Sequence, residues 1–139
     1  MLQLNDVSKR FAGLEALSQV SFNVKGGVIK GLIGPNGAGK TTLMNILYGL
    51  YAPDSGGIIV HGKRLKIRSP HHAIEAGIGM VHQHFRLVEP QTIAENIILG
   101  LSRPRFHLNM LGVEQDIREL SARYGLQLDP TAHIWQLSV

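Results

Sequence analysis

The sequence predicts an α/β fold in which strands come first and helices follow. Three observations support this fold class. Val20, Phe22 and Val24 alternate with polar residues, as in a half-buried antiparallel strand. The apolar segment 28–33 runs into a glycine-rich loop and then into a helical pattern, which makes a strand–loop–helix unit. From about residue 88 onward, the apolar residues follow a helical spacing.

The glycine-rich loop carries the strongest motif of the chain. Residues 34–42 contain G-x-x-x-x-G-K-[ST], the phosphate-binding loop of nucleotide-hydrolysing proteins. Glycines let the backbone fold around a phosphate, so that its N–H groups form an anion nest. Lys40 supplies a charge for the β- and γ-phosphates, and Thr41 offers a hydroxyl to Mg²⁺. The predicted nucleotide-binding residues are Gly34, Pro35, Asn36, Gly37, Ala38, Gly39, Lys40, Thr41 and Thr42.

The elements after the loop follow from spacing and from turn residues. Residues 40–50 predict a helix, because apolar residues recur at i, i+3, i+4 and i+7. A turn at 53–57 precedes a short strand at 58–60, and residues 61–62 form the next turn. Ser69 and Pro70 fit the N-cap and first position of a helix that reaches about Ala76 and ends at Gly77. Residues 78–81 are consistent with a buried strand.

Helices dominate the rest of the chain. Thr92 begins one helix, and a clearer helix spans 113–124, with Gly125 suited to its C′ position. In that second helix, apolar residues at i, i+4, i+7 and i+11 form an amphipathic stripe. We therefore expect two domains, a nucleotide-binding core with a β subdomain at 1–87 and a helical subdomain at 88–139.

Composition excludes several classes of site. The 139 residues fit one domain or part of one, and the absence of cysteine excludes disulfides and thiolate metal sites. The sequence has neither an 18-residue apolar stretch nor a secretory signal, so we expect a cytosolic protein or one that reaches a membrane through a partner. His82 and His84 could form a metal pair, but no third ligand has a plausible spacing.

Four basic residues lie within six positions, and the net charge is +4. They predict either a charged strand edge that resists aggregation or a patch for an anionic partner, and the first interpretation is the more common one. The residues are Lys63, Arg64, Lys66 and Arg68.

In combination, these motifs make the chain resemble the ATP-binding subunits of ABC (ATP-binding cassette) transporters. The matching pieces are the loop at 34–42, "LYGLYAPDSG" at 47–56, Gln83 after an apolar segment, and "TIAENIILG" at 92–100. "IGMVHQHF" together with "IRSP" is most similar to importers of nucleosides and simple sugars. The resemblance implies a P-loop NTPase (RecA-like) core, an N-terminal antiparallel β subdomain and the start of a helical subdomain, which together make an incomplete domain.

The resemblance also implies roles for individual residues. Gln83 would bind Mg²⁺ together with Thr41 and would position the attacking water, and Phe11 would stack on adenine. The cofactors would be ATP and Mg²⁺. The partners would be transmembrane permease subunits, a second ATPase half and, indirectly, an extracytoplasmic solute-binding protein, with no nucleic acid. The protein would lie at the cytoplasmic face of the membrane, where residues 84–90 would transmit motion to the permease.

Parts of the family pattern are missing. Residues 137–139 resemble only the start of the signature motif, none of the ten acidic residues follows an apolar strand, and the switch histidine is absent. The chain therefore resembles the first part of the first ATPase half, and we expect it to lack turnover and to be unstable alone. The alternatives are a non-catalytic nucleotide-binding fragment and a soluble cassette ATPase of translation or DNA repair. A GTPase would need an N-K-x-D motif, which does not follow the D-x-x-G letters at 54–57.

Overall fold

The computed structural model describes residues 1–83, 87–99 and 109–137. The chain forms two compact units, Met1–Val81 and His82–Val139, and each is described below by itself. The domain division expected from the sequence, between residues 87 and 88, stays a prediction.

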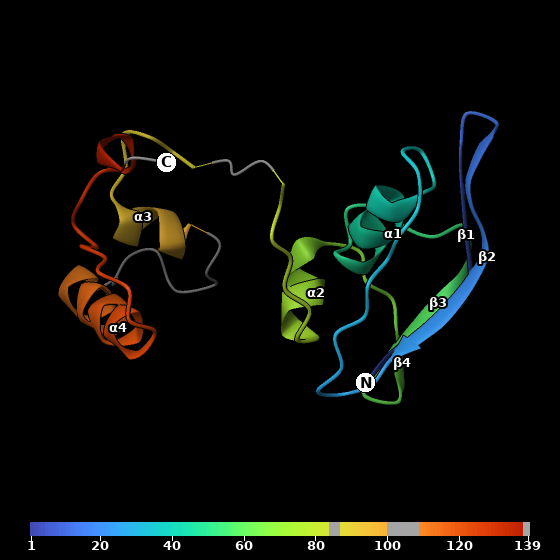
Figure 1. Ribbon diagram of the computed structural model, residues 1–139, viewed down its shortest axis with the longest axis horizontal. Helices are drawn as coiled ribbons and strands as arrows, with labels where there is room; N and C mark the ends of the chain where they lie inside the picture. The colour runs from blue at the N-terminus through green and yellow to red at the C-terminus, as the bar shows by residue number, and fades with distance from the viewer. Residues whose placement is uncertain (84–86, 100–108, 138–139) are drawn as a thin grey trace. The chain divides into compact units, whose positions relative to one another are not determined.

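The first unit is built on a four-stranded antiparallel sheet with the order β2-β1-β3-β4 (Figure 1). Its strands are β1 (Leu2–Phe11), β2 (Leu14–Val24), β3 (Ser55–Val60) and β4 (Lys63–Leu65). The alternation at Val20, Phe22 and Val24 thus predicted a real strand. His61 and Gly62 have φ values of 50° and 78°, which suits the two-residue turn that joins β3 to β4.

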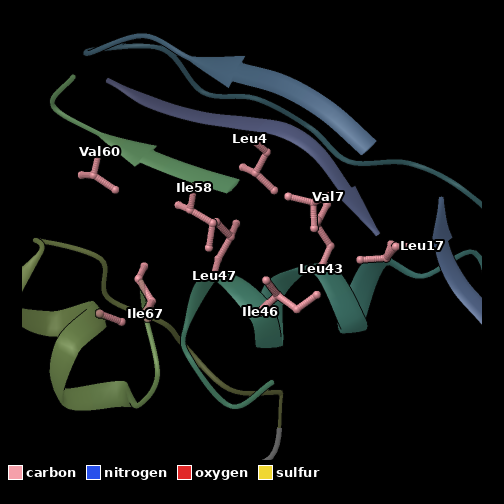
Figure 2. Packing of buried hydrophobic residues seen from close by; sticks show 10 residues of the cluster. Leu4, Val7, Leu17, Leu43, Ile46, Leu47, Ile58, Val60 and Ile67 are labelled. Atoms are coloured by element: carbon pink, nitrogen blue, oxygen red, sulfur yellow. The ribbon is translucent and has the colours of Figure 1, made fainter. Parts of the chain in front are cut away.

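Helix α1 (Lys40–Leu47) buries its apolar side against this sheet. Figure 2 shows side chains of α1 and of the strands meeting in one layer. The members of this core include Leu4, Val7, Leu17, Leu43, Ile46, Leu47, Ile58 and Val60. Helix α1, which begins within the phosphate-binding loop, is therefore anchored on the sheet.

The predicted helix 40–50 is three residues too long, since α1 ends at Leu47. Gly49 has φ 80°, and the Leu50 N–H donates to the Asn45 carbonyl at 2.8 Å, so the chain leaves the helix through a left-handed cap. A Cβ at Gly49 would lie 2.6 Å from the Ser69 carbonyl oxygen, so the close approach of that segment also requires glycine. Leu50 is accordingly 48% exposed and not part of the core.

Helix α2 (Pro70–Glu75) has the ends that the sequence predicted. The Ser69 hydroxyl accepts a hydrogen bond from the His72 N–H, and Pro70 occupies the first turn, where its missing N–H costs nothing. Gly77 follows the helix with φ 80°.

Two predicted strands are absent. Residues 28–33 and 78–81 are expected strands, yet neither forms a strand in the structure. A strand exists only where a neighbour shares its ladder of hydrogen bonds, and none of the described strands lies beside these segments. Ile29 is 100% exposed and Val81 is 84% exposed, so their apolar character is not used for burial here.

The second unit is helical. It contains α3 (Ile93–Ile98), α4 (Met110–Arg123) and the short 3₁₀ helix η1 (Ile134–Gln136). The helix predicted to begin at Thr92 is α3, for which Thr92 is the N-cap, and Gly125 follows α4 with φ 69°. The predicted helix 113–124 begins earlier, at Met110, and its apolar stripe is only half buried. Val113 and Ile117 pack with Ala94, whereas Leu120 is 55% and Tyr124 71% exposed.

None of the helices in the described ranges is both long and apolar enough to cross a membrane.

Candidate functional site

The phosphate-binding loop lies between segment 28–33 and α1. Gly37 and Gly39 have φ values of 83° and 85°, a conformation that glycine adopts without strain. The Ala38 N–H donates to the Pro35 carbonyl at 3.3 Å, which closes a turn inside the loop. The local backbone is thus the folded-back turn that the motif predicted.

Gly39 joins the loop to the sheet. A Cβ at this position would lie 2.4 Å from the Ala16 carbonyl oxygen and 2.7 Å from the Leu17 Cδ2 atom. Because strand β2 and the start of α1 touch this closely, no larger side chain fits without moving the backbone. The position of the loop therefore depends on a residue without a side chain.

The ammonium group of Lys40 points back into the loop. It donates hydrogen bonds to the carbonyl oxygens of Gly34 and Pro35, at 2.6 and 2.7 Å. Helical side chains lean toward the N-terminus of their helix, so Lys40, the first residue of α1, can reach the loop that precedes it. Its charge is held where a loop of this sequence binds phosphate.

The N-terminus of α1 adds to the positive field. Gly39 is its N-cap and provides no side-chain hydrogen bond, and its first turn holds no acidic residue. The first N–H groups of such a helix attract an anion, and the helix dipole has the same sign there. These N–H groups and the Lys40 ammonium therefore both place positive charge at the loop.

Thr41 fits the role of a Mg²⁺ ligand. Its side chain is exposed in the first turn of α1, and within the described residues its hydroxyl makes no hydrogen bond. Among those residues, no three His, Cys, Asp or Glu side chains are grouped to hold a metal ion. In phosphate-binding loops of this sequence, the Ser or Thr hydroxyl after the lysine is a ligand of Mg²⁺ beside the nucleotide phosphates.

Phe11 is the last residue of β1, at the end of the β1–β2 hairpin. Its ring lies 5.1 Å from the ring of Tyr51, at an interplanar angle of 70°. The Lys9 ammonium lies 5.4 Å from the ring centroid of Phe11. Phe11 is 37% exposed, so part of its surface is open to a ligand.

Asp54 ties the segment after α1 to β1. Its carboxylate accepts hydrogen bonds from the Lys9 ammonium at 2.7 Å and from the Arg10 N–H at 2.8 Å, and its own N–H donates to Ser8 at 3.0 Å. The hydrogen bond from Lys9, and next the one from Arg10, hold the pKa of this carboxyl below its ordinary value of 3.8. The carboxylate is therefore ionised at neutral pH.

Gln83 belongs to the second unit, where its side chain is exposed. Its cooperation with Lys40 and Thr41 stays a prediction. His84 lies outside the described residues, so the structure gives no account of a pairing with His82.

The basic stretch occupies the edge of the sheet. Lys63 and Arg64 lie on β4, the edge strand, in agreement with the interpretation that charge protects an edge. A cavity of about 220 Å³ opens beside it and is away from the phosphate-binding loop, since none of residues 34–42 lines it. Its lining includes Pro53, Gly57, Arg64, Lys66 and Arg68.

Neither the contact of Tyr51 with Phe11 nor that of Asp54 with Lys9 was predicted from the sequence. The letters "YAPDSG" contributed to the resemblance, but they gave no reason to place these residues at the end of β1. Both contacts join residues at least forty positions apart, 11 with 51 and 9 with 54, and no local periodicity reports such pairs.

A family profile described as "ABC transporter" matches residues 17–139. Among curated proteins, the guanosine import ATP-binding protein NupO of Bacillus subtilis (strain 168) is 45% identical over 140 residues. The nucleoside import ATP-binding protein NupA of Lactococcus lactis subsp. cremoris (strain MG1363) is 48% identical over 140 residues. Both alignments cover 100% of this chain, and the chain spans 28% of the length of each relative.

Solved structures agree with the fold. A nucleotide-free ATP-binding cassette from an ABC transporter superposes with a TM-score of 0.79 at 26% identity, over 99% of this chain and 58% of the other. The ATP-binding cassette MJ0796, a dimer in a post-hydrolysis state bound to ADP and Pi, gives a TM-score of 0.74 at 26% identity, over 99% of this chain and 63% of the other. The described elements are therefore those of an ATP-binding cassette, as the sequence predicted.

Proposed function

The chain belongs to the ABC transporter family, and from that premise we propose that residues 34–42 bind the triphosphate of ATP. In the complete protein, hydrolysis of this ATP drives the import of a nucleoside or a simple sugar. The relatives named for guanosine and nucleoside import support this solute class.

The position of Lys40 is the observation that carries the proposal. Its ammonium is turned into the loop by two short contacts to carbonyl oxygens, beside a helix N-terminus that has no side-chain cap. A phosphate is a better partner for an ammonium group than neutral carbonyls are, because the opposite charges of ammonium and phosphate attract each other in addition to the hydrogen bond. Nucleotide binding therefore replaces the two internal contacts of Lys40 with contacts to phosphate.

The remaining roles follow the chemistry of phosphoryl transfer, which requires positioning and neutralisation of charge. Phe11 stacks on the adenine, and Gln83 positions the attacking water. Thr41 and Gln83 would hold Mg²⁺, which would neutralise phosphate charge. A second ATPase half completes the site.

Lys40→Ala in the complete protein tests the proposal. We expect ATP affinity to fall at least tenfold and ATP hydrolysis to be lost, because the removed charge faces the β- and γ-phosphates. Lys63→Ala is the matched control, since Lys63 is an exposed lysine on the edge strand β4 of the same unit. Calorimetric titration with ATP measures the affinity, and unchanged affinity in Lys40→Ala would refute the proposal.

None of the ten acidic residues of the sequence follows an apolar strand, where the resemblance places the residue that polarises the water. We propose that the 139-residue chain does not hydrolyse ATP, and that turnover needs the longer protein. A phosphate-release assay on both samples, at equal nucleotide occupancy, checks this statement. Turnover by the 139-residue chain at the rate of the complete protein would contradict it.

We also propose that the complete protein binds permease subunits at the cytoplasmic face of the membrane, with an extracytoplasmic solute-binding protein as an indirect partner. Residues 84–90 would contact the permease, and of these the structure describes 87–90. Asn96 holds this segment to α3, since its side chain accepts from the Val88 N–H at 2.8 Å and donates to the Val88 carbonyl at 3.1 Å. A displacement of Val88 would therefore move α3, which carries Asn96.

Cross-linking tests this contact. The 139 residues contain no cysteine, so Leu87→Cys adds a single thiol to the segment. We expect a cross-link to the permease from Leu87→Cys and none from Leu111→Cys, which is 77% exposed on α4 and serves as control. Equal labelling of both positions, or of neither, would count against the role of this segment.

A further inference from the structure

The aromatic ring of Phe11 is held by the segment that follows α1. Phe11 ends β1, and the hairpin turn beyond it contains Ala12 and Gly13 with φ values of 43° and 90°. A ring at the end of a hairpin has few neighbours on its own strands to fix its rotamer. Tyr51 supplies the missing contact, at 5.1 Å between ring centroids and in an edge-to-face arrangement that is favoured for aromatic pairs.

Tyr51 is in turn carried by a well-fixed segment. Three residues further on, Asp54 bonds to three consecutive residues of β1, through the Ser8 carbonyl, the Lys9 ammonium and the Arg10 N–H. These contacts end one residue before Phe11 itself. The segment 51–54 and the end of β1 are therefore joined by hydrogen bonds and by a ring contact, and we call this assembly the aromatic bracket.

The bracket lies close to the phosphate-binding loop. Lys9 pairs with Leu17 across the β1–β2 ladder, and Leu17 is the residue that a side chain at Gly39 would meet at 2.7 Å. Phe11 is two residues further along β1, or about 7 Å at the usual rise of a strand. Phe11 thus lies two strand residues from the place where the sheet meets the loop, within the same unit.

The bracket leaves both rings accessible. Phe11 is 37% exposed and Tyr51 40% exposed, so the pair is not buried as core. The Tyr51 hydroxyl makes no hydrogen bond within the described residues, so the contact with Phe11 depends on the aromatic ring. An accessible ring held at a fixed angle is the arrangement that stacking on a flat base requires.

From this geometry we infer that Tyr51 is a positioning residue for nucleobase binding, which it serves by holding the ring of Phe11 through the aromatic bracket. The inference rests on the proposed function, in which Phe11 stacks on adenine. Tyr51 affects binding of the base and does not affect binding of the phosphates, which the loop holds. Its effect on affinity must therefore pass through Phe11.

Two ligands separate these effects in the complete protein. ATP carries the base and the phosphates, whereas inorganic tripolyphosphate carries the phosphates alone. We expect Tyr51→Leu to weaken ATP binding by about threefold to tenfold, the range that one aromatic pair contributes, and to leave tripolyphosphate binding unchanged. Tyr51→Phe keeps the ring and should bind ATP like the wild type. Asp54→Asn should weaken ATP binding in the same selective way, because it loosens the segment that carries Tyr51.

Double variants that combine each Tyr51 substitution with Phe11→Ala show whether Tyr51 acts through Phe11. If Tyr51 acts through Phe11, Tyr51→Leu has no further effect on ATP affinity once Phe11 is alanine. Four results overturn the inference: wild-type ATP affinity in Tyr51→Leu, an equal loss for tripolyphosphate, a full effect in the Phe11→Ala background, or a defect in Tyr51→Phe. If Phe11→Ala itself leaves ATP affinity unchanged, the stacking role in the proposed function fails first, and the inference fails with it.

Discussion

Gly37 and Gly39 have nearly the same φ, 83° and 85°, but different surroundings. A Cβ at Gly37 would meet nothing within 4 Å, whereas one at Gly39 would collide with the Ala16 carbonyl. The pair therefore separates two reasons for a glycine in a phosphate-binding loop. One is backbone conformation, and the other is close packing against a strand.

We expect Gly39→Ala to reduce ATP affinity far more than Gly37→Ala does. Alanine at either position carries the cost of a left-handed backbone, about 1–2 kcal/mol. Only alanine at 39 must also push β2 away from α1, which moves the N–H groups that face the phosphates. Titration of both variants of the complete protein with ATP measures the difference. Equal losses would show that the contact with β2 is unimportant for binding.

Thr92 and Glu95 form the most complete local signal among the described helices. The Thr92 hydroxyl accepts from the Glu95 N–H at 3.2 Å, and the Glu95 carboxylate accepts from the Thr92 N–H at 2.7 Å. The hydrogen bond from the Thr92 backbone, followed by that from its hydroxyl, holds the pKa of Glu95 below its ordinary value of 4.5. The ionised carboxylate therefore stabilises the start of α3 at pH values above the ordinary pKa of 4.5. This stabilisation is lost as the pH falls through the lowered pKa of Glu95.

For α3 we predict that Thr92→Ala destabilises the helix by about 1 kcal/mol at pH 7, as the loss of an N-cap does. Hydrogen–deuterium exchange over residues 93–98 should therefore become several-fold faster, while Thr92→Ser retains the wild-type rate. As the pH falls through the lowered pKa of Glu95, the hydrogen bond from the residue-92 N–H to this carboxylate should weaken in both proteins, because Thr92→Ala keeps that N–H. Equal exchange of Thr92→Ala and the wild type at pH 7 would show that the Thr92 hydroxyl plays no part in the cap.

Local signals in the sequence predicted these elements well, because their causes are local. The side chains of Ser69 and Thr92 cap the starts of α2 and α3, and Gly125 adopts a positive φ after α4, as glycine does without strain. The loop at 34–42 was predicted for the same reason. The strands predicted at 28–33 and 78–81 do not form, because a strand needs a neighbouring strand and apolar composition does not provide one. The contact between Phe11 and Tyr51 escaped prediction because only the folded sheet brings the two rings together.

Considered as a whole, the 139-residue chain exposes apolar residues that a stable protein buries. Ile29 is 100% and Ile33 96% exposed, on the segment that leads into the phosphate-binding loop. Burial of one such side chain stabilises a fold by about 1.5–3 kcal/mol, and total stability is only about 5–15 kcal/mol. The relatives are longer, since this chain spans 28% of NupO, and a longer protein can cover this segment.

We therefore predict that the 139-residue chain lacks a cooperative thermal transition and binds an apolar dye, whereas the complete protein melts cooperatively. Two substitutions, Ile29→Lys and Ile33→Lys, provide a second test, because their expected effects differ between the 139-residue chain and the complete protein. In the 139-residue chain both side chains already face water, so dye binding should fall without any loss of helix or strand signal in circular dichroism. In the complete protein the same changes would bury a charge if segment 28–33 is covered there, and the melting temperature should fall by several degrees. Unchanged melting of the complete protein would mean that the segment stays exposed, and its apolar residues would then need another explanation, such as contact with a partner.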